Sequence, residues 1–130
     1  MRPRLLIGAF AALLLIAVGC AGNIVPTPPG TPGVTEVTLS SSPSSPVVGT
    51  PTTLTVTAAN SNTKIDTIDI DFENDGTSDE EQTFDALSVS ATFSHVYTAA
   101  GSVIVRTEVE DQAGGIVSKT LLLIVETPPQ

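Results

Sequence analysis

The chain has few of the residues that cross-link a small domain or add large side chains to its core. Its 130 residues include one cysteine, Cys20, so no internal disulfide can form. Tryptophan is absent and aromatic residues make up only 4% of the sequence, so a core must be built mainly from aliphatic side chains. Histidine occurs once, as His95, and neither a nucleophile elbow nor an HExxH motif is present. We therefore expect no enzymatic activity.

Basic residues are also scarce. The chain has 5 Lys and Arg residues against 14 Asp and Glu residues, and two of the bases are Arg2 and Arg4. From residue 20 onward, three bases face 14 acids, which gives a formal charge of −11. Such a field repels phosphate groups, so we expect neither a nucleic-acid partner nor attraction to anionic lipids. It favours solubility and the binding of cations.

The first 20 residues have the pattern of an export signal. Arg2 and Arg4 precede the uninterrupted apolar segment Leu5–Val18. As a helix, these 14 residues would reach roughly 21 Å, less than the ~30 Å hydrocarbon core of a bilayer. That length is typical of the apolar region of a signal peptide rather than of a permanent span.

This segment ends in AVGC (residues 17–20), which resembles the lipobox of bacterial lipoproteins, although Ala17 stands where Leu is commoner. The resemblance implies that residues 1–19 are removed, that Cys20 receives a diacylglycerol and that its new amino group is acylated. Two or more acyl chains anchor a protein stably. The residue after Cys20 is Ala21, not the Asp that retains many lipoproteins in the inner membrane. If the source is Gram-negative, the resemblance therefore implies the outer membrane. The alternatives are an ordinary signal with an A-x-A-like cleavage site and an uncleaved anchor.

Residues 20–34 join the signal to the rest of the chain. Ala21–Val34 contains four prolines and three glycines. Proline lacks an N–H donor and fixes φ, so this segment can form neither a helix nor a central strand. We expect a semi-extended tether that spaces a domain from the membrane; a ligand for a proline-recognition domain is the alternative.

From residue 35 to residue 126, apolar side chains alternate with polar ones, and turn residues recur about every 8–12 positions. Pro43–Pro51 and Asp111–Gly115 are expected turns, and Leu121–Val125 does not alternate, so its facing is ambiguous. We predict an all-β domain over residues 35–126, an immunoglobulin-like antiparallel β-sandwich of about seven strands, followed by a tail at 127–130. The alternating positions are Val37 and Leu39; Leu54, Val56 and Ala58; Ile68, Ile70 and Phe72; Val89, Ala91, Phe93, His95 and Tyr97; and Val103, Val105, Thr107 and Val109.

Three segments of this region resemble the motifs of the PKD (polycystic kidney disease) domain family. They are DIDFENDG (69–76), FSHVYTAAGSV (93–103) and VEDQAG (109–114), in the family's order and at its spacing. The resemblance implies a PKD-type sandwich over about residues 35–126. The departures from the family pattern are Ile70, Ala100 and Val103, where Trp, Pro and Tyr are frequent, and they imply a less aromatic core.

The same resemblance implies structural roles for four residues of the motifs. His95 would hold the turn before the strand that Gly101 opens. Tyr97 would donate a hydrogen bond back across a corner of the sandwich, as in related folds. Asp111 matches the Asp of the third family motif.

Residues 66–85 contain nine acids and no base. Part of this segment follows a calcium-loop pattern, in which alternate carboxylates converge on one cation and a glycine permits the sharp turn. Position 12 is Gln82 instead of a bidentate Glu, and strands flank the loop, so an EF-hand is excluded. The loop positions 1, 3, 5, 7 and 9 are Asp71, Glu73, Asp75, Thr77 (through its carbonyl) and Asp79, with Gly76 at position 6.

Two interpretations of this run stay open: a Ca²⁺ site and a solvated acidic turn. The PKD resemblance adds to the first, since related sequences often carry a similar run and some bind calcium. A glycosidase-like carboxylate pair is not expected, because nine acids on one hairpin form a general field rather than a tuned pair.

Together these features predict a non-enzymatic, membrane-anchored surface lipoprotein. Its PKD-type domain would contact a protein or a polysaccharide, or serve as a structural part of the cell envelope. One alternative is a calcium-dependent adhesion module centred on residues 71–79. Another is an accessory subunit of a surface hydrolase complex, because PKD-type domains often accompany such enzymes.

Overall fold

The computed structural model describes residues 33–130, so residues 1–19, Cys20 and most of the expected linker lie outside the described residues. The described part contains no helix, and hence none that could cross a membrane. It consists of seven strands, which are β1 (Glu36–Ser42), β2 (Pro51–Ala59), β3 (Ile65–Asp71), β4 (Glu80–Ala86), β5 (Ser88–Val96), β6 (Gly101–Asp111) and β7 (Ile116–Val125).

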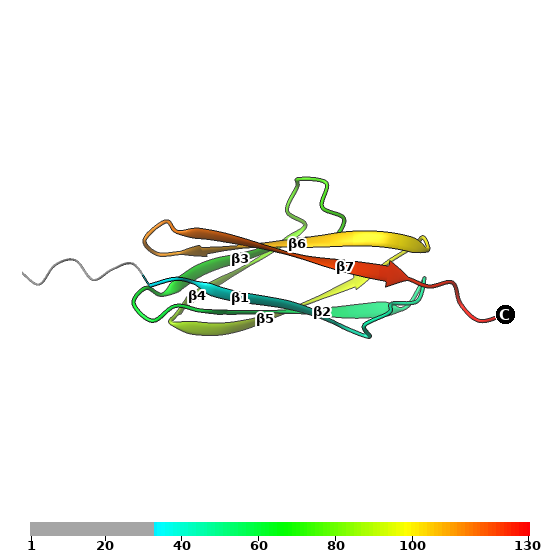
Figure 1. Ribbon diagram of the computed structural model, residues 1–130, viewed down its shortest axis with the longest axis horizontal. Coiled ribbons are helices and arrows are strands. Elements are labelled where there is room, and N and C mark those ends of the chain that lie inside the picture. Colours follow the sequence, from blue (N-terminus) through cyan, green and yellow to red (C-terminus); the bar gives the residue numbers. More distant parts are fainter. Residues whose placement is uncertain (1–32) are drawn as a thin grey trace, which may run out of the picture.

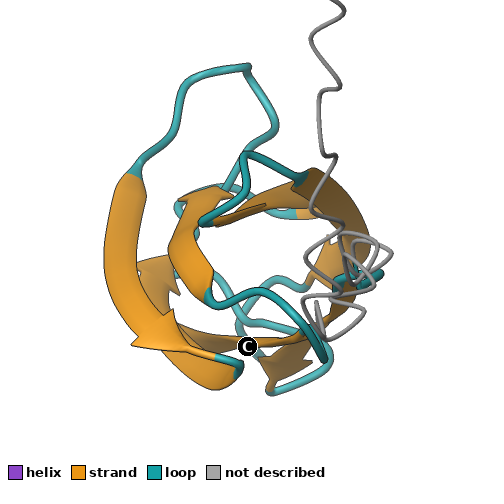
Figure 2. Ribbon diagram, turned by 90° about the vertical axis from the view of Figure 1, so that its left-hand side faces the viewer, coloured by secondary structure: helices purple, strands orange, loops and turns teal. Residues whose placement is uncertain are grey.

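The strands form two sheets that pack face to face (Figure 1). One has the order β1-β2-β5 and the other the order β4-β3-β6-β7, and all strand pairs are antiparallel. The view along the strands shows both sheets curving around one interior (Figure 2). The predicted immunoglobulin-like sandwich of seven strands is confirmed.

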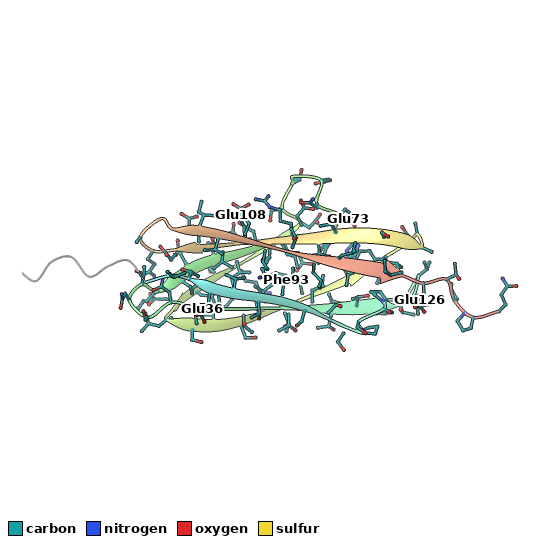
Figure 3. The ribbon with its side chains drawn as sticks, in the orientation of Figure 1. Glu36, Glu73, Phe93, Glu108 and Glu126 are labelled. Atoms are coloured by element: carbon teal, nitrogen blue, oxygen red, sulfur yellow. The ribbon has the colours of Figure 1, made fainter. Side chains whose placement is uncertain are left out.

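Alternation of apolar and polar residues explains why these segments form strands with one buried face. In β2, Leu54, Val56 and Ala58 are fully buried, and Thr52 is buried on the same face. The alternate threonines 53, 55 and 57 face outward or lie at intermediate depth. β5 pairs with β2 and buries Ala91 and Phe93 on the same side. Figure 3 shows Phe93 pointing into the space between the two sheets.

The ambiguous segment 121–125 forms the second half of β7. Leu123 and Val125 are buried and Leu121 is half-buried, whereas Leu122 and Ile124 point outward and are exposed. The segment is therefore an ordinary strand whose side chains alternate between the two faces, and apolar residues occupy both faces.

β4 was not identified from the sequence. Its residues, EEQTFDA, look like the continuation of an acidic loop, and only Gln82 and Phe84 are partly buried. The strand exists because it pairs with β3 at the edge of the four-stranded sheet, where Gln82 lies opposite Ile68 and Glu81 opposite Asp69. Pairing between distant segments overrides a weak local preference.

A buried polar network fixes the end of the sandwich at which the described chain begins. Asn60 Nδ2 donates hydrogen bonds to the Gly33 carbonyl at 2.8 Å, to Thr35 Oγ1 at 2.9 Å and to Asp111 Oδ2 at 3.4 Å. Asp111 Oδ1 accepts from the N–H groups of Ala113 at 3.0 Å and Gly115 at 2.9 Å. The network joins the start of β1 to the β6–β7 turn.

Candidate cation site

The loop between β3 and β4, residues 72–79, stands out from the four-stranded sheet (Figures 1 and 2). It carries the central part of the acidic segment. Asn74 (φ 54°) and Gly76 (φ 93°) both adopt the left-handed conformation, which turns the chain sharply within a few residues.

Asp71, the last residue of β3, organises this loop through its carboxylate. Its Oδ1 accepts from the N–H groups of Glu73 at 3.3 Å and Asp75 at 3.1 Å, and its Oδ2 accepts from Gly76 N–H at 2.8 Å. Burial opposes ionisation, but the backbone N–H groups of residues 73–76 outweigh it and lower the pKa of Asp71 below its usual value of 3.8. Asp71 is therefore a buried, ionised carboxylate that shapes the loop.

Asp79 closes the loop from its other end. Its Oδ2 accepts from Phe72 N–H at 2.8 Å, and its own N–H donates to the Ile70 carbonyl at 2.8 Å. As a result, one carboxylate oxygen from each of Asp71, Glu73 and Asp79 lies within 4.8 Å of the others. We call this group the carboxylate cluster.

The structure brings together three of the five expected ligands. Asp75 is outside the carboxylate cluster, and its Oδ1 instead accepts from Thr77 N–H at 2.8 Å. Both residues are exposed in the outer part of the loop. The sequence pattern did not predict that Asp75 and Thr77 would lie outside the cluster, because the hydrogen bonds within the loop decide which carboxylates converge.

His95 on β5 connects the carboxylate cluster to the opposite sheet. Its Nε2 lies 3.0 Å from Glu73 Oε1, and its ring stacks on Phe72 with centroids 4.3 Å apart. Tyr97 meets the same imidazole edge-on at a centroid distance of 4.6 Å. The motif residues His95 and Tyr97 thus lie directly beneath the acidic loop, a contact that their separation in sequence did not indicate.

Tyr97 does not form the expected hydrogen bond across a corner of the sandwich. Its side chain is buried, with 4% of the residue exposed, and within residues 33–130 its hydroxyl has no hydrogen-bonding partner. Burial, together with the negative charges of Glu73 and Asp79, raises the pKa of Tyr97 to about 12. The expectation was wrong because the phenol is placed among the side chains below the loop, where Glu73 is already engaged by His95.

Two hollows flank the loop. One of about 230 Å³ is lined by Glu73, His95, Tyr97 and Val103, among others. The other, of about 150 Å³, lies between the loop and β6, and its lining includes Asp69, Asp71, Ser78, Arg106 and Glu108. Arg106 pairs with Glu108 and donates to Ser118 Oγ at 3.2 Å, so its charge is already shared with an acid.

The carboxylate cluster fits a hard divalent cation such as Ca²⁺. Carboxylate oxygens are the preferred ligands of this ion, and water or backbone carbonyls can complete its coordination. The Tyr97 phenol lines the same hollow as Glu73, and its buried hydroxyl has no partner within residues 33–130.

The other two motif residues lie at the ends of β6. Gly101 begins the strand with φ 137°, a conformation that other residues rarely adopt. Asp111 ends it and holds the β6–β7 turn through the network described above. Both positions concern backbone geometry rather than ligand chemistry.

No family model matches the sequence, and no curated protein matches it. Solved structures do match, at low sequence identity. The PKD domain of an M14-like peptidase from a Thermoplasmatales archaeon has a TM-score of 0.57 and 23% identity, covering 73% of this chain and 95% of that one. The PKD1 domain of Epp from Vibrio anguillarum has a TM-score of 0.53 and 17% identity, covering 75% and 100%. The fibronectin(III)-like modules of CbhA from Clostridium thermocellum give 0.54 and 16%, covering 72% and 100%. The described part of the chain therefore has a PKD-type, immunoglobulin-like fold.

Proposed function

We propose that this PKD-type domain is a non-enzymatic contact module, exported and held at a bacterial membrane by a lipid on Cys20. It would bind a protein or a polysaccharide, or contribute to the structure of the cell envelope. The observation that carries the proposal is the domain itself: a sandwich whose neighbours in structure are PKD and fibronectin(III)-like modules, following a signal-like segment that ends in AVGC. A single sandwich at the end of a proline-rich tether would be displayed rather than buried in the membrane.

The geometry of the described part agrees with such a tether. β1 begins at the end of the sandwich that carries the Asn60 network, and the C-terminus lies at the opposite end (Figure 1). If residues 20–34 anchor the domain, its C-terminal end would point away from the membrane. The sides of the sandwich, including the loop 72–79, would be exposed to partners.

The anchor is tested by metabolic labelling with an alkyne fatty acid in a bacterial host. The full chain is expected to incorporate the label and to partition into detergent, and Cys20→Ala is expected to lose both properties. Cys20→Ser serves as the isosteric control. Equal labelling of the wild type and both variants would refute the lipid anchor, while leaving the domain's role as a contact module open to separate test.

A calcium-dependent form of this function is the second candidate, and the carboxylate cluster supports it. Two carboxylates of the loop and that of Asp71 come together, and the buried, unpartnered phenol of Tyr97 lines the same hollow as Glu73. Bound Ca²⁺ would hold Asp71, Glu73 and Asp79 and so fix the loop on the face that a partner meets. The ion supplies charge neutralisation and rigidity there.

Thermal unfolding with added Ca²⁺ tests this candidate. At tenfold excess over Kd, one site should raise the melting temperature by about 6 °C or more. Glu73→Gln should abolish the rise without dismantling the loop. The backbone N–H groups of the loop donate to the carboxylate of Asp71, and this substitution leaves those hydrogen bonds in place. Asp66→Asn, an exposed acid outside the carboxylate cluster, is the matched control and should keep the full rise. Absence of both a shift and a heat of binding would exclude the site.

An accessory role beside a surface hydrolase is the third candidate. The structurally similar PKD domain from the Thermoplasmatales archaeon comes from an M14-like peptidase. Cosedimentation of the full chain with collagen, chitin and cellulose tests this role. Retention on one polymer, competed by its soluble fragments, would support it, and equal recovery from all three would count against it.

A further inference from the structure

The outer face of the β6–β7 ribbon carries three large apolar side chains that the rest of the domain does not cover. Ile104 lies opposite Leu122 in the strand register, and Ile124 is two positions further along β7 on the same face. The three residues are 46%, 61% and 50% exposed, respectively. We call Ile104, Leu122 and Ile124 the apolar patch.

Along the same face the character changes from apolar to acidic. Alternate positions of β6 after Ile104 are Arg106, Glu108 and Glu110, and Asp69 of β3 lies opposite Glu108. Arg106 pairs with Glu108, so Asp69 and Glu110 carry the acidic charge of this half of the face that no base of residues 33–130 pairs. At about 3.3 Å per residue, Ile104 is separated from Glu108 by roughly 13 Å and from Glu110 by roughly 20 Å. Figure 3 shows Glu108 on the outside of the four-stranded sheet, on the side from which the loop projects.

The acidic loop borders the patch on its β3 side. Asp71, the last residue of β3, pairs with Arg106, so β3 ends before it reaches the level of Ile104. The loop 72–79 leaves the sheet at this point and carries Glu73, Asp75 and Asp79. The apolar patch therefore lies between the β7 edge of the sheet and a cluster of negative charge.

We propose that this face binds a protein segment that presents branched or aromatic side chains to the apolar patch and lysine or arginine side chains to Asp69 and Glu110. Three apolar residues are too few for an interface of the usual ~800 Å² per partner, so the acidic half of the face must take part. Charge complementarity then requires that the basic side chains of the partner lie about 13–20 Å from its apolar side chains.

A second copy of the chain does not meet this requirement. It would set the formal charge of −11 that residues 20–130 carry against the same charge on the other copy, and would bring two acidic loops together. An anionic membrane surface is disfavoured for the same reason. The inference rests on the proposed function as a contact module and names the chemistry of its partner.

The test uses the full chain, placed in phosphatidylcholine nanodiscs where it carries lipid and kept free in solution where it does not. The zwitterionic surface of these nanodiscs does not attract a basic peptide. The probe is a fluorescent cyclic β-hairpin peptide with Ile and Val at one end of one face and Lys at the other end. Binding is followed by fluorescence anisotropy at low and at moderate salt. Leu122→Thr with Ile124→Thr should weaken binding at least about tenfold, and Asp69→Asn with Glu110→Gln should weaken it and flatten its salt dependence.

Leu87→Thr is the matched control, because Leu87 is 47% exposed but lies in the β4–β5 connection. It should leave binding unchanged. The proposal is overturned by any of four results: no binding of the probe, equal binding of a peptide with the same residues in scrambled order, equal loss in Leu87→Thr, or self-association that Leu122→Thr abolishes. Because peptide binding does not depend on lipid, its failure is distinguishable from failure of the Cys20 anchor.

Discussion

Glu73 Oε1 lies 3.0 Å from His95 Nε2, and this contact joins the acidic loop of one sheet to a strand of the other. Phe72, the residue before Glu73, stacks on the same imidazole with its ring centroid 4.3 Å away. Two neighbouring residues of the loop thus hold one side chain of β5. Phe72 packs on the imidazole ring, and the Glu73 carboxylate contacts its Nε2. The loop is therefore attached to the sandwich at the point where the carboxylate cluster forms.

These two contacts should contribute unequally to stability. Glu73→Gln alters only the half-exposed carboxylate contact with His95 and should lower the free energy of unfolding by less than about 1 kcal/mol. His95→Ala removes the stacking on Phe72 and the edge contact with Tyr97, and it should cost about 1–3 kcal/mol. Urea unfolding of both variants measures the difference. Equal losses would show that the Glu73–His95 contact, not the ring packing, holds the loop.

The all-β sandwich could be predicted from sequence because nearly every strand buries one face, as Leu54, Val56 and Ala58 show in β2. β4 could not, because its burial is slight and its existence depends on pairing with β3. The facing of Leu121–Val125 also needed the partner strand, since apolar residues on both faces remove the alternation.

The candidate site was predictable only in outline. The spacing of Asp71, Glu73 and Asp79 indicated convergence on one point, and these three carboxylates do meet. The exclusion of Asp75 depends on which backbone N–H each carboxylate accepts, and this is settled by the left-handed residues Asn74 and Gly76. The contact of Tyr97 with the site arises from packing between the two sheets, for which a sequence pattern carries no signal.

Asp71 should make the stability of the domain sensitive to acid. Burial raises its pKa, but the N–H groups of residues 73–76 outweigh burial and hold the pKa below 3.8. Its contribution is therefore present above the unfolded-state value and is lost as the pH falls through the lower folded-state pKa. Asp71→Asn should cost about 1–3 kcal/mol at neutral pH and should weaken the decline below pH 4. Urea midpoints measured from neutral pH down to strongly acidic pH test this, and parallel pH profiles for the two proteins would contradict it.

Gly115 should be intolerant of a side chain because of its closeness to Asp111. A Cβ added at residue 115 would lie 2.6 Å from Asp111 Oδ2, and that carboxylate is held by Asn60 and Thr35. Gly115→Ala should therefore destabilise the domain by about 1–3 kcal/mol. In an Asp111→Ala background the obstruction is gone, so the added cost of Gly115→Ala should be small. A double-mutant cycle by urea unfolding measures this coupling, and additive losses would disprove the contact.

Tyr97 offers a direct optical test of the charge around the carboxylate cluster, because it is the only tyrosine in a chain without tryptophan. Its ionisation, followed by ultraviolet absorbance, should have a midpoint near 12 in the folded protein and near 10 after unfolding. Because the folded-state pKa is the higher one, the protonated phenol stabilises the fold fully below pH 10, and this stabilisation is lost as the pH rises through 12. Glu73→Gln should lower the folded-state midpoint, since one of the two nearby charges is removed.

The same titration should respond to calcium. If Ca²⁺ binds the carboxylate cluster, it neutralises Glu73 and Asp79, so the Tyr97 midpoint should fall below 12 and the tyrosine fluorescence should change in parallel. The Asp66→Asn protein should show the same fall, whereas in Glu73→Gln the calcium response should be lost. A midpoint that stays near 12 at saturating Ca²⁺ would mean that the ion does not reach the cluster. A fall that persists in Glu73→Gln would mean that it acts elsewhere on this acidic domain.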